Sequence, residues 1–213
     1  QSWLEGFRYA SSFAPARALL IIVAVLAWTI MPYSSLMPIY ARDVYAGGPH
    51  TLGFLLAAAG AGALASTTYL ASRRNILGLG KVIFRAAALC GLALAAFAYV
   101  GSPAVGLALM FAVGGTVILA AASSNTILQT IVEDRLRGRL AGFYTLAFLG
   151  VAPLGNLAAG ALAARFGAPA TFAINGAIAF VAALWFGYRL PHLQRLARPV
   201  YVERGILKDE TRR

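Results

Sequence analysis

The chain has 213 residues, of which 60% are hydrophobic and only 12% are charged, and its formal net charge is +11. Soluble globular domains carry about twice this share of charged residues. A nucleic-acid-binding protein is excluded, because the Lys and Arg side chains avoid the long apolar runs instead of alternating with the aromatic residues. An apolar chain whose positive excess sits in loops is typical of a membrane protein.

The first 17 residues resemble a helix that lies on the membrane surface. Trp3, Phe7, Ala10 and Ala14 fall on one helical face, with polar residues away from it. Residue 1 is not Met, and no basic segment with a cleavage site follows it. We therefore expect residue 1 to be a cut inside a longer protein.

Six apolar segments then follow, each long enough to cross a hydrocarbon core of roughly 30 Å, which needs about 20 residues. Proline in the first turn predicts helix starts at Ser102-Pro103 and Ala168-Pro169. Thr51 is the predicted N-cap of the second segment. The predicted spans are residues 18–40, 52–71, 82–100, 104–131, 140–164 and 169–188, and residues 191–213 form a basic tail.

The charged residues predict the orientation of these spans. All 18 Lys and Arg residues except Arg42 and Arg165 fall on one side of the predicted membrane. Basic residues are enriched in cytoplasmic loops. Both termini of the segment are therefore expected in the cytoplasm, which agrees with an even number of spans.

Uncharged polar residues concentrate in the first and fourth spans. Thr116, Ser123 and Thr126 fall within an arc of about 80° on the fourth span. Thr29 and Tyr33 share a face of the first span. Such stripes either join helices or line a wet cavity, and both interpretations stay open from the pattern alone.

The second and fifth spans are rich in Gly and Ala, whereas the third and sixth are almost featureless and suit contact with lipid. Small residues allow close helix packing, either inside the bundle or against a partner surface that slides or bends. Pro153, with Gly155 after it, is expected to let the fifth span bend. The order polar, small, plain repeats after three spans, which favours two inverted three-helix repeats.

The run "NTILQTIVEDRLRGRLAGFYTLAFLGVAPLGNLAAG" and the run "MPYSSLMPIYARDVYAGGPHTLGFLLAAAGAGALAS" resemble major facilitator superfamily transporters, of the branch similar to enterobactin, drug and macrolide exporters. The resemblance implies the C-terminal six-helix half of a twelve-helix protein, with residues 1–17 as the end of the linker between halves. It also implies that the first and fourth spans line the substrate cavity. The cavity candidates are then Thr29, Tyr33, Thr116, Ser123 and Thr126.

The charged loops suggest a cytoplasmic latch between the halves. Glu133 and Asp134 end the fourth span, Arg137 and Arg139 precede the fifth, and Gly138 is expected to allow a tight turn between them. The loop "SRRNILGLGK" keeps the basic part of the family's loop signature in Arg73 and Arg74, without its acidic member. The alternative is that these arginines only enforce topology.

The predicted function is export of a small lipophilic or neutral organic compound across a bacterial cytoplasmic membrane by alternating access. Its predicted partners are lipid, an N-terminal six-helix half and the substrate, with protons as candidate coupling ion. No Asp, Glu or His lies at mid-membrane, so a proton carrier is expected in the other half. Motifs for ATP, metal or another cofactor are lacking, and an intramembrane enzyme is disfavoured. A membrane scaffold or sensor without transport is the alternative.

Overall fold

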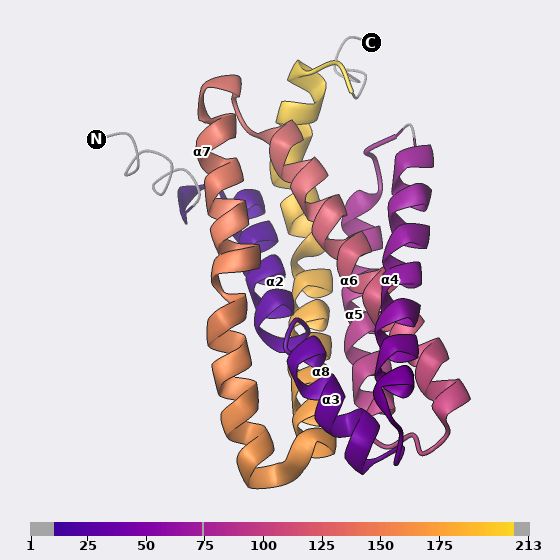
Figure 1. Ribbon diagram of the computed structural model, residues 1–213. Helices are drawn as coiled ribbons and strands as arrows, with labels where there is room; N and C mark the ends of the chain where they lie inside the picture. Colours follow the sequence, from indigo (N-terminus) through magenta and orange to yellow (C-terminus); the bar gives the residue numbers. More distant parts are fainter. Residues whose placement is uncertain (1–10, 74, 207–213) are drawn as a thin grey trace.

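The computed structural model describes residues 11–73 and 75–206, and all regular secondary structure in them is helical. The predicted all-α class is thus confirmed (Figure 1). The elements are α2 (Ala14–Thr29), α3 (Tyr33–Asp43), α4 (Pro49–Ser72), α5 (Leu79–Phe97), α6 (Pro103–Ile131), α7 (Asp134–Thr145), a π-helical turn η1 (Leu146–Gly150) and α8 (Ala152–Glu203).

Five helical stretches in the described residues are long and apolar enough to cross a membrane, where the sequence predicts six spans. The difference lies in the last stretch, which runs for 69 residues from Arg135 to Glu203. Its backbone leaves the helical region at Gly167 (φ 82°, ψ 163°), a conformation essentially confined to glycine. The chain reverses direction there (Figure 1), so we call residues 152–166 the first arm of α8 and residues 168–203 its second arm.

Proline and glycine set most helix boundaries. Ser102 is the N-cap of α6 and Pro103 its first residue, as predicted. The prediction for Thr51 is wrong, because α4 already begins at Pro49 with Gly48 as its N-cap. Proline suits the first helical turn, where its missing N–H would have no helical partner, and this moves the start ahead of Thr51.

The first predicted span is interrupted in its middle. Helix α2 ends at Thr29 and α3 begins at Tyr33, with a turn closed by the Tyr33 N–H, which donates to the Ile30 carbonyl at 2.9 Å. Pro32 lies in this turn and cannot donate the hydrogen bond that would continue α2. Residues before and after it therefore no longer follow one helical phase.

Glycines bring three pairs of helices into backbone contact, namely α4 with α6, α5 with α8, and α8 with α2. A Cβ on Gly114 of α6 would lie 2.1 Å from the Ala59 carbonyl oxygen of α4, and one on Gly62 of α4 would lie 2.0 Å from that of Phe111. Similar contacts join Gly91 of α5 to Gly176 of α8. By contrast, Gly53, Gly60 and Gly160 face open space. Some small residues of the second and fifth predicted spans therefore pack inside the bundle, and others lie on its surface.

The elements have a clear front and back in Figure 1. Helices α2 and α3 and the upper part of α6 occupy the middle of the view, and the lower part of α6 passes behind α4 toward one edge. Helix α7 and the first arm of α8 lie at the other edge. Helix α5 and the second arm of α8 lie behind them. The polar spans thus lie largely between the two small-residue spans, and the plain spans lie behind them.

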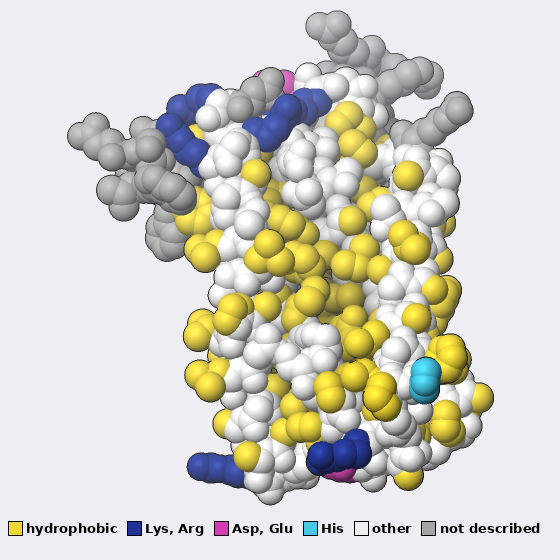
Figure 2. Space-filling model, in the orientation of Figure 1, with side chains coloured by type: hydrophobic (Ala, Val, Ile, Leu, Met, Phe, Trp, Pro, Cys, Tyr) yellow, Lys and Arg dark blue, Asp and Glu magenta, His cyan; other side chains and the backbone are white. Residues whose placement is uncertain are grey.

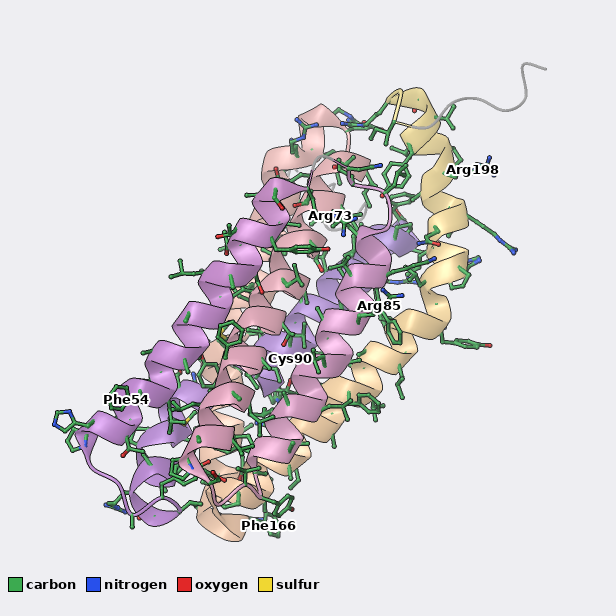
Figure 3. The ribbon with its side chains drawn as sticks, turned by 90° about the vertical axis from the view of Figure 1, so that its right-hand side faces the viewer. Phe54, Arg73, Arg85, Cys90, Phe166 and Arg198 are labelled. Atoms are coloured by element: carbon green, nitrogen blue, oxygen red, sulfur yellow. The ribbon has the colours of Figure 1, made fainter. Side chains whose placement is uncertain are left out.

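Basic side chains gather at the end of the bundle where α6 ends and α7 begins, which we call the basic end (Figure 2). A second, smaller group lies at the opposite end, and none lies between them on this face. Figure 3 shows Arg73 and Arg198 toward the basic end, Cys90 near the middle, and Phe54 and Phe166 toward the other end. The described basic residues of this end include Arg73, Lys81, Arg135, Arg137, Arg139, Arg195, Arg198 and Arg204.

Candidate functional site

The threonines of the predicted cavity bond to their own helices. The Thr116 hydroxyl donates to the Ala112 carbonyl at 2.6 Å, and Thr126 donates to Ala122 at 2.9 Å. Each hydroxyl proton is therefore used within the helix, while the oxygen can still accept a hydrogen bond. The stripe on α6 offers acceptors and methyl groups to a ligand rather than free donors.

Burial divides the five cavity candidates. Thr29 and Ser123 are fully buried, whereas Tyr33, Thr116 and Thr126 are half-buried. The Ser123 hydroxyl has no hydrogen-bond partner among the described residues. In this structure, Thr29 and Ser123 thus belong to the core, and the other three remain near a surface.

Helix α8 contacts both sides of the break between α2 and α3. The Ser35 hydroxyl of α3 donates to the Asn156 side-chain oxygen of α8 at 2.9 Å. One residue earlier, a Cβ on Gly155 would lie 2.4 Å from the Trp28 carbonyl oxygen of α2. Gly155, expected to help a bend, is thus a point of close approach, and sequence reasoning did not find the partner of Asn156.

A π-helical turn precedes Pro153. It spans Leu146–Gly150, and Pro153 then lies in the first turn of α8. Proline cannot donate the hydrogen bond that would join it to the preceding helix. Single π-turns inside helices occur frequently at functional sites, and this one lies just before the contact between α8 and α2.

The charged segment after α6 contains an ion pair within itself. Glu133 forms an ion pair with Arg135 at 2.7 Å, and both side chains are more than half exposed. Arg135 was not among the predicted latch residues. An exposed pair of this kind contributes about 0–1 kcal/mol. Asp134 begins α7, and Arg74 lies outside the described residues.

Gly138 does not form the predicted tight turn. It lies inside α7, and a Cβ there would meet nothing within 4 Å. The chain turns instead at Val132 and Glu133, whose ψ angles of 139° and 143° are extended. The Leu136 N–H then donates to the Glu133 carbonyl at 2.9 Å and starts the helix. Two extended residues are enough to connect α6 and α7, so no positive φ is needed.

We therefore expect Gly138→Ala to raise the free energy of unfolding by up to about 1 kcal/mol, because alanine is the better residue in a helix interior. The transition temperature of the purified full-length protein in detergent would measure the change. Gly142→Ala, also in α7 with open space around it, is the matched control and should behave alike. A loss of stability at Gly138 alone would contradict its helical placement.

Arg73 is held by its own loop. Its guanidinium donates to the Leu77 carbonyl at 3.3 Å and to the Tyr69 hydroxyl at 3.4 Å, and lies 5.9 Å from the centre of the Tyr69 ring. The Leu77 N–H donates to the Asn75 side chain at 2.8 Å. These contacts of Arg73 thus fix the loop after α4.

A polar cavity of about 610 Å³ opens at the basic end. It brings together Thr126 of the predicted stripe and Arg137 of the predicted latch, which sequence reasoning assigned to separate roles. Arg204 donates a hydrogen bond to the Val132 carbonyl, and so ties the end of α8 to the end of α6. Nothing in the sequence distinguishes Arg204 from the other arginines of the tail. The lining residues are Thr126, Gln129, Thr130, Arg137, Arg204 and Ile206.

A family model described as transmembrane secretion effector, within the major facilitator superfamily, matches residues 1–200. The chain belongs to this family. The match confirms the resemblance to major facilitator transporters. No curated protein matches the chain.

Family membership sets the class of function. The transmembrane secretion effectors are membrane transporters, so the chain is a multi-pass membrane transporter and not an enzyme. The described residues contain no group of three or more side chains that could hold a metal ion.

Proposed function

We propose that the chain is the C-terminal six-helix half of a secondary active exporter that works by alternating access. The observation that carries the proposal is the polar cavity at the basic end. A hydroxyl stripe on α6 and the first turns of α7 share it, so movement of the charged segment would change access to the stripe. The resemblance to exporters favours outward transport of a small lipophilic or neutral compound.

The two arms of α8 would cross the membrane separately. The first arm together with the preceding η1 and the end of α7, and the second arm by itself, each provide the roughly 20 apolar residues that a crossing requires. The two arms run in opposite directions (Figure 1). Together with the other four stretches they make six crossings, as two inverted three-helix repeats. Arg42 and Arg165 then lie outside, and the basic end faces the cytoplasm of a bacterium.

The exposed small-residue faces would meet the N-terminal half. Gly53 and Gly60 of α4 and Gly160 of α8 face open space, and these elements lie at the two edges of the near side (Figure 1). Small residues permit close approach of helices in a membrane. Tyr33, Thr116 and Thr126, between the two edges, would then face the substrate.

The latch would use the basic end. Arg137, Arg139 and Arg73 would exchange ion pairs with the other half when the cytoplasmic mouth closes, together with Arg74, Glu133 and Asp134. Each exposed pair is weak, at about 0–1 kcal/mol, so the network as a whole would bias the equilibrium. Pro153 and the π-helical turn before it would let the fifth crossing flex, and protons are the candidate coupling ion.

A labelling experiment on the full-length protein tests alternating access. Cys90 is the single cysteine of these 213 residues and is fully buried, so this part of the protein adds little background for a membrane-impermeant maleimide. Thr126→Cys should react with maleimide that is added on the side of the basic end. A pH gradient together with a fluorescent lipophilic substrate should change the rate of this labelling at least about fivefold. Thr67→Cys on the exposed face of α4 is the control for general accessibility.

A scaffold or sensor makes a different prediction. It would show no gradient-driven loss of the fluorescent compound from vesicles, and Thr126→Cys would react at one rate under all conditions. That pair of results would overturn the transport proposal. Transport without a change in labelling would overturn only the assignment of the cavity.

A further inference from the structure

A second cavity lies at the basic end, behind the proposed transport route. It has a volume of about 260 Å³ and lies between α2, α5, α6 and the second arm of α8, with the loop before α5 on one side. It shares no residue with the polar cavity, and its lining contains none from α4, α7 or the first arm. This volume is just below the roughly 300–1,000 Å³ of small-molecule sites.

The wall of this cavity is almost entirely apolar. Leu19 of α2, Ile127 of α6 and Phe186 of α8 come from three separate helices. Gly80 completes the wall, and a Cβ there would lie 2.6 Å from the Leu190 side chain. The apolar lining residues are Pro15, Leu19, Ile76, Leu77, Ile127, Phe186, Leu190, Leu193 and Ala197. Such a wall favours a hydrocarbon chain over a polar ligand.

None of the polar side chains that line the cavity is acidic. Gln194, Arg198 and Tyr201 supply an amide, a guanidinium and a phenol. All three lie on the last turns of α8, toward the end of the bundle where Arg73 and Arg198 lie in Figure 3. The Arg73 guanidinium lies 3.9 Å from the position of a Cβ on Gly78, at the edge of the cavity. A guanidinium binds phosphate well because its N–H groups match the phosphate oxygens.

We propose that this cavity holds part of one acyl chain of an anionic phospholipid, whose phosphate binds at Arg198. Charge complementarity decides the choice of ligand, since an apolar slot ending in cationic and neutral donors fits an acyl chain below an anionic head group. Basic pockets between membrane helices are known to take anionic lipid head groups. The bound lipid would brace α2 against α5 and α8 at the basic end. The site does not depend on the transport proposal.

Native mass spectrometry tests the site. Full-length protein would be released from nanodiscs that contain equal amounts of phosphatidylglycerol and phosphatidylcholine. We expect one phosphatidylglycerol to be retained, at least about fivefold more often than phosphatidylcholine. Equal retention of the two lipids would overturn the proposed recognition of the anionic head group.

Two matched pairs of variants locate the lipid. Ala197→Trp fills the cavity and should lower phosphatidylglycerol retention at least about fivefold, whereas Leu196→Trp, on an exposed neighbour, should not. Arg198→Gln should reduce the preference for the anionic lipid more than Arg195→Gln, which lies outside the cavity lining. Ala197→Leu replaces the tryptophan variant if that variant does not give monodisperse protein. Unchanged retention in the cavity-filling variant would place the lipid elsewhere and overturn the proposal.

Discussion

Gly114→Leu is expected to remove most of the folded protein. Even a Cβ at this position would lie 2.1 Å from the Ala59 carbonyl oxygen and 2.6 Å from the carbonyl carbon. Both atoms belong to the backbone of α4 and cannot rotate away as a side chain does. Helices α4 and α6 would have to separate, and overpacking of a well-packed core costs typically 1–3 kcal/mol or more. We expect monodisperse protein to fall at least about fivefold, measured by fluorescence-detected size-exclusion chromatography.

Gly60→Leu is the matched control for this prediction. Gly60 lies on α4, close to Ala59 in sequence, but a Cβ there would meet nothing within 4 Å. Both substitutions replace a helical glycine by leucine, so the gain in helix propensity is the same. The amount of folded protein should stay within about twofold of wild type. An equal loss in the two variants would show that the contact between α4 and α6 is not the cause.

Arg137→Gln is expected to reduce transport at least about tenfold without loss of folded protein. Arg137 lines the polar cavity together with Thr126 and Gln129, so its charge acts where the proposed route opens. Glutamine removes the charge and stays polar, but it is shorter and has fewer N–H donors than arginine. Gradient-driven efflux from proteoliposomes that contain the full-length protein would measure the effect.

Arg135→Gln serves as the control for Arg137→Gln. It lies two residues earlier in α7 and pairs with Glu133 in an exposed position, where an ion pair is worth about 0–1 kcal/mol. Its efflux rate should stay within about threefold of wild type. If both variants lose transport equally, the charge of the whole segment matters and the specific role of Arg137 is wrong.

The candidate site was only partly predictable. Thr126 and Arg137 were selected from a polar stripe and a charged loop, and the structure places both on one cavity. Ser123 was selected from the same stripe and is fully buried, because its helical phase does not tell which neighbour covers it. Arg204 was missed, since its contact with Val132 joins residues 72 positions apart.

The resemblance of two runs of the sequence indicated the family. Composition and local pattern determined the membrane class and the helical fold of this protein. These properties are local, because every span must satisfy its own backbone hydrogen bonds within about 20 apolar residues. Tertiary structure alone decided which glycines lie in contacts, where the fifth span changes to a π-helical turn, and that α7 borders a cavity. In a membrane, the lipid is as apolar as the helix surfaces, so apolar periodicity does not show which face meets another helix. Only the packed bundle distinguishes Gly114, held against α4, from Gly60, which faces open space.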